Sequence, residues 1–182
     1  MKLKNAAIFH GTGGNKDSFW HPWLKNELEG RGYKVWLPSL PNPDIADLKE
    51  WLPFVLDNGE YNKETVLVGH SSGAPLILSI LENIETPIKQ VILVGGYCEQ
   101  LSAHKSLTLQ EKYDWNKIRR NCKEFIFINS DDDPWGCNDT HGRKMFDKLG
   151  GAQIILHRQG HMGSEKFNQP YKKFPLLLKL ID

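Results

Sequence analysis

Short apolar runs alternate with amphipathic stretches along this chain. The runs are rich in Val, Ile and Leu and are too short for helices, a pattern typical of strands buried in a parallel sheet. They cover residues 6–10, 34–37, 65–69, 90–95, 124–129 and 153–156. These runs predict a sheet of about six mostly parallel strands.

Between the runs, apolar residues recur at helical spacing. The predicted helices cover residues 23–31, 47–56, 74–83 and 140–149, and a terminal helix over 166–180 is interrupted by Pro170 and Pro175. Strands that alternate with helices predict an α/β fold, with a doubly wound sheet and helices on both faces. The long connection 97–117 lacks strand character, and we expect it to form a short lid.

Length and charge fit one globular domain. A chain of 182 residues is long enough for one core and short for two, so residues 1–182 are interpreted as a single domain. The formal net charge is +1, with Lys and Arg scattered among Asp and Glu. This balance predicts no nucleic-acid partner and no binding to a membrane surface.

We expect neither a targeting segment nor a membrane span. The apolar run before His10 is too short for the core of a signal peptide, and no later run is long enough to cross a bilayer. The three cysteines, Cys98, Cys122 and Cys137, form no C-x-x-C pair, which argues against a disulfide scaffold or a zinc site. These features predict a cytoplasmic protein.

A Gly-x-Ser-x-Gly motif, Gly69-His70-Ser71-Ser72-Gly73, follows the third predicted strand. A serine on a sharp strand-to-helix turn needs small neighbours two residues away, which Gly69 and Gly73 provide. The turn also aims the first N–H groups of the helix, Ser72 foremost, at negative charge that develops beside the Ser71 oxygen. The motif predicts Ser71 as a nucleophile, and a purely structural turn is the alternative.

A nucleophilic serine needs a base, and the base needs an acid to orient it. Gly160-His161-Met162-Gly163 follows the last predicted strand at the sheet edge where Ser71 lies, so His161 is the predicted base and a solvated loop histidine the alternative. His70 is expected to point away from the nucleophile and to pack. Three further histidines lie in surface-like segments and are interpreted as ordinary: His21, His104 and His141.

Three aspartates follow the fifth predicted strand, in Ser130-Asp131-Asp132-Asp133-Pro134. They cannot all approach one imidazole, and a solvated acidic turn is the alternative interpretation. Their place between Ser71 and His161 gives the chain order Ser, Asp, His, which is typical of α/β-hydrolases. One of the three is the predicted acid, and the residues alone leave the choice open.

A glycine-rich turn, His10-Gly11-Thr12-Gly13-Gly14-Asn15, follows the first predicted strand. Its backbone N–H groups can approach a ligand, and we expect Thr12 to supply a second oxyanion donor beside Ser72. A dinucleotide fingerprint would need glycine in place of Lys16, and a P-loop would need a Gly-Lys-Ser/Thr ending. We therefore predict no nucleotide cofactor.

A metal site could be built from His157 and His161 with nearby aspartates. The two histidines are four residues apart, but His157 ends a predicted strand, so they share no helical face. No H-E-x-x-H motif is present either. We predict no metal.

The chain resembles the small serine hydrolases that include the retinoblastoma-binding protein 9 family and related bacterial proteins. The resemblance covers nearly the whole length and rests on the motifs above together with Trp20-His21-Pro22-Trp23-Leu24, Leu40-Pro41-Asn42-Pro43 and Trp51-Leu52-Pro53. It implies an α/β-hydrolase fold and a triad of Ser71, Asp133 and His161, in which the aspartate directly precedes Pro134. Asp132 stays the alternative, because Trp135-Gly136-Cys137 stands where relatives tend to have Val-Pro or Leu-Pro.

These features predict a serine hydrolase that cleaves a small carboxylic ester or amide, including small peptides and amino-acid esters, through an acyl-enzyme on Ser71. A non-catalytic protein-interaction module on the same scaffold is the alternative, since the family has members discussed as binding proteins. Four aromatic residues are candidates for an apolar wall of the substrate pocket: Trp20, Tyr97, Trp115 and Trp135.

Overall fold

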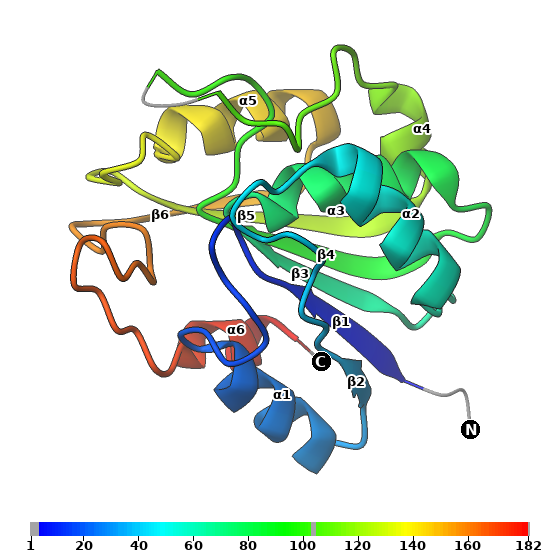
Figure 1. Cartoon of the computed structure of the whole chain (residues 1–182). Helices are drawn as coiled ribbons and strands as arrows, with labels where there is room; N and C mark the ends of the chain where they lie inside the picture. Colours follow the sequence, from blue (N-terminus) through cyan, green and yellow to red (C-terminus); the bar gives the residue numbers. More distant parts are fainter. Residues whose placement is uncertain (1–3, 103–104, 182) are drawn as a thin grey trace.

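The computed structural model describes residues 4–102 and 105–181, and its strands form one parallel sheet (Figure 1). The strands are β1 (Asn5–Phe9), β2 (Lys34–Trp36), β3 (Val66–His70), β4 (Ile88–Val94), β5 (Cys122–Ser130) and β6 (Ala152–Leu156). Their order across the sheet is β2-β1-β3-β4-β5-β6, and every neighbouring pair is parallel. The predicted α/β fold with about six strands is confirmed.

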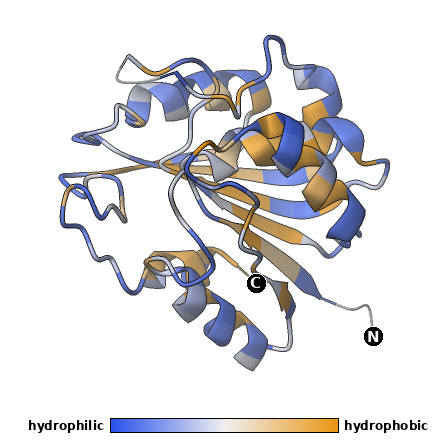
Figure 2. Cartoon of the chain, in the orientation of Figure 1, coloured by the Kyte–Doolittle hydropathy of each residue, from blue (hydrophilic) through white to orange (hydrophobic). Residues whose placement is uncertain are grey.

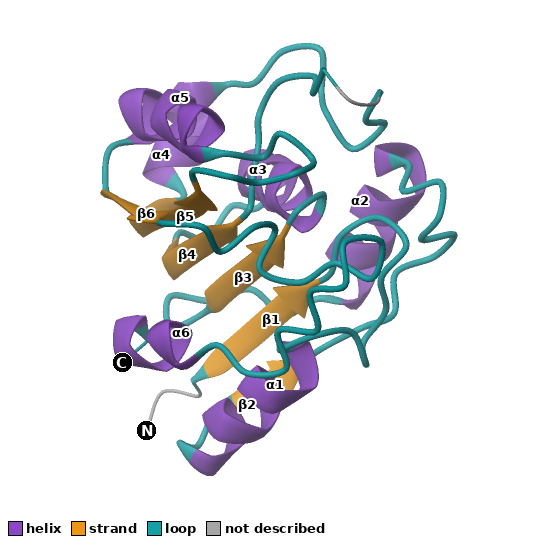
Figure 3. Ribbon diagram, turned by 90° about the vertical axis from the view of Figure 1, so that its left-hand side faces the viewer, coloured by secondary structure: helices purple, strands orange, loops and turns teal. Residues whose placement is uncertain are grey.

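Helices cover both faces of the sheet. They are α1 (His21–Gly30), α2 (Leu48–Asn58), α3 (Gly73–Asn83), α4 (Trp115–Arg120), α5 (Asp139–Leu149) and α6 (Pro175–Leu180). Figures 1 and 3 show α1 and α6 together on one face and α2 to α5 on the other. This arrangement is the doubly wound sheet that the alternation of strands and helices predicts.

Successive side chains of the central strands face opposite sides of the sheet. In β1, Ala7 and Phe9 belong to the cluster under α2 to α5, whereas Ala6 and Ile8 belong to the cluster under α1 and α6. The same alternation runs through β3, β4 and β5. Burial on both faces explains the unbroken apolar runs within these strands, which Figure 2 shows in orange.

The predicted terminal helix is mostly absent. Only Pro175–Leu180 is helical, and the segment before it is irregular, with an antiparallel bridge between Ser164 and Gln169. Pro170 lacks the N–H that a helix interior requires, whereas Pro175 stands in the first turn of α6, where no such bond is lost. The apolar spacing over 166–180 was therefore misleading.

The predicted lid lies partly outside the described residues, which omit 103–104 and thus His104. Its described part is fastened to α2 by the bond from Leu48 N–H to the Leu107 carbonyl. Its end forms the unpredicted helix α4, which begins after the cap Asp114, whose carboxylate accepts from Lys117 N–H.

Over the described ranges, no helix combines the length and apolar character needed to cross a membrane.

Candidate active site

Ser71 occupies a strained turn between β3 and α3. Its φ is 54°, in the left-handed region that non-glycine residues seldom adopt, and its N–H donates to the Val94 carbonyl at 2.9 Å. A Cβ on Gly69 would lie 2.6 Å from the Gly73 carbonyl oxygen, and one on Gly73 would lie 2.4 Å from the Phe9 carbonyl oxygen. The turn closes because both positions are glycine.

Asp133 and His161 meet at the carboxyl edge of the sheet. Asp133 follows β5, His161 follows β6, and Asp133 Oδ2 lies 2.7 Å from His161 Nδ1, with both residues buried. The second carboxylate oxygen accepts from Trp135 N–H at 2.9 Å. Because a carboxylate accepts, His161 Nδ1 carries the proton and Nε2 keeps its lone pair.

The two neighbouring aspartates contact other groups. Asp132 Oδ1 accepts from Ser130 Oγ–H at 2.7 Å and from Gly160 N–H at 2.8 Å, and these bonds lower the pKa of its carboxyl. Asp131 accepts from Arg158 N–H at 2.8 Å and lies 2.6 Å from His157 Nδ1. The structure thus brings Asp133 to His161, whereas Asp132 and Asp131 fasten the loop that leads to it.

Ser71 and His161 line the same cavity, of about 410 Å³. Ser71 Oγ forms no hydrogen bond within residues 4–102 and 105–181, so a bond to His161 Nε2 would have to form when substrate binds. Such bonds are commonly long or misaligned in structures without substrate. The structure thus places the predicted nucleophile and the predicted base at one pocket.

The glycine-rich turn after β1 passes directly against Ser71. A Cβ on Gly11 would lie 2.7 Å from Ser71 Cβ and 3.2 Å from Ser71 Oγ. His10 anchors the turn, because its Nε2 accepts from Leu40 N–H at 2.9 Å and its Nδ1–H donates to the Gly11 carbonyl at 2.8 Å. The structure therefore brings the predicted second oxyanion donor, Thr12, to the Ser71 turn.

His70 packs as predicted and also supports His161. Its Nε2–H donates to the His161 carbonyl at 2.8 Å, and its ring lies 5.7 Å from the Trp20 ring, centroid to centroid. The side chain is buried, and this burial holds its pKa well below the usual value. His70 therefore stays neutral and holds the backbone of the histidine loop.

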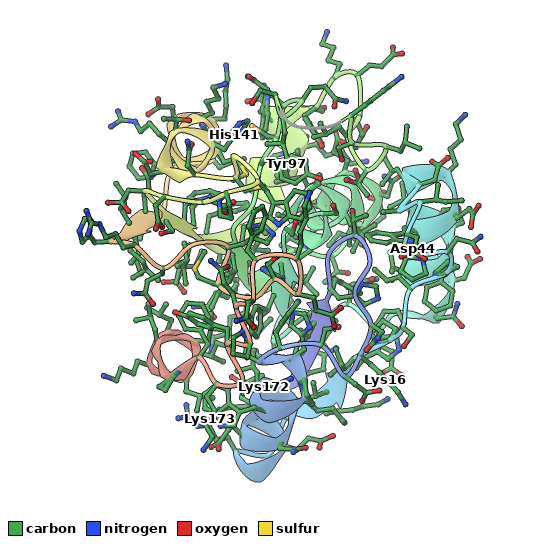
Figure 4. The ribbon with its side chains drawn as sticks, turned by 60° about the vertical axis from the view of Figure 1, so that its left-hand side comes forward. Lys16, Asp44, Tyr97, His141, Lys172 and Lys173 are labelled. Atoms are coloured by element: carbon green, nitrogen blue, oxygen red, sulfur yellow. The ribbon has the colours of Figure 1, made fainter. Side chains whose placement is uncertain are left out.

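The interpretation of His21 as a surface residue is wrong. Its side chain is completely buried, and burial lowers its pKa to about 3. The helix α1 begins at His21, two residues before the predicted start, which turns the residue toward Trp20 and His70. His141 is half-buried beside Tyr97, as Figure 4 shows, and burial lowers its pKa also.

Of the four predicted pocket aromatics, the structure places only Trp135 in the cavity wall. Trp20 is completely buried and donates its Nε1–H to the Met162 carbonyl, and Tyr97 is buried and does not line the cavity. Trp115 lies in α4 against Tyr113. Trp20 and Tyr97 are thus buried packing residues, and Trp115 packs half-buried against the core.

Sequence reasoning missed several residues of the wall and rim. Phe19 lines the wall, and the charged residues Asp44, Glu165 and Lys166 lie at the cavity, with Asp44 labelled in Figure 4. Lys166 lies 4.7 Å above the Trp135 ring. The false helix over 166–180 concealed part of this rim, and no residue from the described part of 97–117 contributes to it.

Asp133, Cys137 and His161 form a group, among the described residues, that could hold a metal ion. Their donor atoms lie within 4.8 Å of one another. Burial raises the pKa of the Cys137 thiol well above its usual value, so the thiol stays protonated, and His161 Nδ1 already binds Asp133. The group is better suited to a hydrogen-bonded pair beside a neutral thiol than to a metal centre.

The sheet order, the Ser71 turn and the histidine loop define an α/β-hydrolase fold. The crystal structure of the ydeN gene product of Bacillus subtilis matches it with a TM-score of 0.89 at 26% identity, over 98% of this chain and 96% of that one. An esterase from Exiguobacterium antarcticum has the same fold at 13% identity, with a TM-score of 0.69 over 98% and 91% of the two chains.

Sequence comparison gives the family. The profile described as serine hydrolase matches residues 6–181, and the chain belongs to this family. It is 33% identical to the hydrolase YdeN of Bacillus subtilis over 135 residues, 71% of each chain. It is 27% identical to the serine hydrolase RBBP9 of Rattus norvegicus over 173 residues, 90% of each chain. The predicted family resemblance is confirmed.

Proposed function

We propose that Ser71 attacks the carbonyl carbon of a small carboxylic ester or amide. His161 Nε2 takes the proton from Ser71 Oγ, and Asp133 holds the imidazole and stabilises the imidazolium. The backbone N–H groups of Thr12 and Ser72 bind the oxyanion. His161 then gives its proton to the leaving alcohol or amine, and a water molecule releases the acid from the acyl-enzyme.

The buried contact between Asp133 and His161 carries this proposal. A histidine and an aspartate joined at 2.7 Å at the cavity that Ser71 also lines are the arrangement that activates a serine. Membership of the serine hydrolase family supports the same chemistry.

The cavity supports a small substrate. Its volume of about 410 Å³ is near the lower end of small-molecule sites, which span roughly 300–1,000 Å³. Phe19 and Trp135 offer apolar contact beside Ser71, and charged side chains surround the opening. We therefore propose a small-molecule substrate rather than a nucleic acid or a membrane. We also propose a cytoplasmic location, on the sequence features given above.

A fluorophosphonate probe tests the nucleophile. The proposal expects one probe molecule per chain, attached to Ser71, and loss of labelling in Ser71→Ala. Ser18→Ala is the matched control, because Ser18 lines the same cavity and should label as the wild type does. Labelling that persists in Ser71→Ala would remove Ser71 as the nucleophile.

Steady-state hydrolysis of an ester tests whether Ser71 supports catalysis. With a p-nitrophenyl ester of a short acid, the wild type should release nitrophenol continuously and Ser71→Ala should not. If the wild type labels at Ser71 and turns over no member of a broad panel of activated esters and amides, catalysis is not its function. A protein that co-purifies in fixed ratio would then favour the interaction module.

A further inference from the structure

A hydrogen-bonded series of hydroxyl groups, all buried except that of Thr12, begins at the two candidate oxyanion donors. Thr12 Oγ1 lies 2.7 Å from Ser72 Oγ, and Ser72 Oγ lies 2.9 Å from the Tyr97 hydroxyl. The Tyr97 hydroxyl lies 2.7 Å from Ser106 Oγ and 3.3 Å from Thr108 Oγ1, which are themselves 2.8 Å apart. The series therefore connects the loop after β1 and the start of α3 with the segment after β4.

Tyr97 is the centre of this series. Its side chain is completely buried, and its hydroxyl has three oxygen neighbours, which match the one hydrogen bond that it can donate and the two that it can accept. Burial raises the pKa of Tyr97, so the hydroxyl keeps its proton at neutral pH. Such a saturated buried group fixes the positions of its neighbours.

Thr12 and Ser72 differ in exposure. Thr12 is exposed and lines the cavity, in a turn of four residues that contains three glycines, Gly11, Gly13 and Gly14. Ser72 is buried, and its Oγ lies within hydrogen-bond distance of Thr12 Oγ1 and the Tyr97 hydroxyl. The hydrogen bond between the Thr12 and Ser72 side chains thus joins the glycine-rich loop to the start of α3. The Tyr97 hydroxyl bonds to Ser72 from the other side.

We propose that Tyr97 is a positioning residue of the oxyanion hole, whose hydroxyl holds Ser72 and, through Ser72, Thr12. The inference rests on the proposed function, in which the N–H groups of Ser72 and Thr12 bind the oxyanion. Those donors must lie about 2.7–3.1 Å from the oxygen of the transition state. Tyr97 belongs to the segment predicted as a lid, and its role here is to position the oxyanion donors rather than to cover the cavity.

The test compares Tyr97→Phe with the wild type on a p-nitrophenyl ester. Losing one oxyanion donor outright costs roughly 10²–10³ in kcat, and loosening two donors should cost part of that, about tenfold. KM should change less than about twofold, because the ester in its ground state does not use the oxyanion geometry. Ki for a boronic acid, which mimics the tetrahedral state, should rise by the same factor as kcat/KM falls.

Tyr113→Phe is the matched control. Tyr113 is also buried, but no hydrogen bond joins its hydroxyl to Tyr97 or Ser72 among the described residues, so its removal should leave kcat within about twofold of the wild type. A merely structural role of Tyr97 predicts equal effects of the two changes, or a loss in unfolding midpoint with unaltered kcat in the folded enzyme. Either result overturns the proposal.

Coupling to Thr12 gives a second, independent measurement. Thr12→Val removes the hydroxyl and should lower kcat, whereas Thr12→Ser keeps it and should restore activity. If Tyr97 acts through Ser72 on Thr12, the double variant Tyr97→Phe/Thr12→Val loses less than the product of the two single losses. Multiplicative losses overturn the proposal, and a wild type that turns over no activated ester or amide overturns the proposed function itself.

Discussion

At the scale of single residues, neighbours in sequence have separate tasks. Asp131, Asp132 and Asp133 are consecutive, yet the turn after β5 sends each carboxylate to a different partner. Asp132 is tied to Ser130 and Gly160, so it shapes the path of the loop that carries His161. Only Asp133 is both buried and in contact with the imidazole, so exposure separates a structural carboxylate from a candidate catalytic one.

Exchanging each carboxylate for an amide separates these tasks. In Asp133→Asn the amide N–H₂ faces His161 Nδ1 and favours the tautomer that protonates Nε2, so we expect kcat to fall by roughly 10⁴. In Asp132→Asn the amide oxygen can still accept from Gly160 N–H, so we expect less than a tenfold loss. Steady-state kinetics with the same ester measure both. A large loss in Asp132→Asn with a small one in Asp133→Asn would reassign the acid to Asp132.

At the scale of elements, the apolar pattern predicted each strand but not the segment after β6. A strand buried on both faces must be continuously apolar, so its sequence signal is strong, as in β3 and β4. The segment 166–174 has helical spacing without a helix, because Pro170 interrupts the hydrogen bonding and Ser164 pairs with Gln169 instead. The pocket rim that this segment supplies was therefore hidden, and Lys166 with it.

The close contact of Gly73 in α3 with the backbone of β1 predicts that a larger side chain at this position destabilises the fold. An added methyl group would lie 2.4 Å from the Phe9 carbonyl oxygen, which is backbone and cannot rotate away, so α3 would have to shift. We expect Gly73→Ala to destabilise the fold by about 1–3 kcal/mol or more, the usual range for overpacking. Urea unfolding measures the free energy.

Gly30→Ala is the control for this change. Gly30 ends α1 and has open space where a Cβ would stand, so alanine there should be neutral or stabilising by up to about 1 kcal/mol. Equal stability of Gly73→Ala and the wild type would show that α3 can move away from β1 without cost.

At the scale of the molecule, the carboxyl ends of parallel strands collect the candidate site at one edge. Thr12 follows β1, Ser71 follows β3, Asp133 follows β5 and His161 follows β6. Chain order and strand direction make this convergence predictable from sequence. The contact of Tyr97 with Ser72 could not be predicted from sequence, because Tyr97 comes from a segment with no regular pattern of apolar residues.

The same edge concentrates buried histidines, which makes stability depend on pH. Burial lowers the pKa of His10, lowers that of His21 to about 3 and holds that of His70 well below its usual value. In the unfolded chain these histidines bind protons below about pH 6.5. The unfolded state then binds more protons than the folded state, so folding stability is complete above that pH and falls as the pH drops from about 6.5 toward 3.

Urea unfolding at pH 7.5, 6.5, 5.5 and 5.0 measures this dependence. Each histidine that stays neutral in the folded state should remove up to about 1.4 kcal/mol of unfolding free energy per pH unit below 6.5. His21→Phe keeps a ring against Trp20 and has no proton to bind, so between pH 6.5 and 5.0 its free energy should fall by about 2 kcal/mol less than that of the wild type. A variant that loses stability as steeply as the wild type would mean that His21 binds its proton in the folded protein as well, and would contradict the lowered pKa.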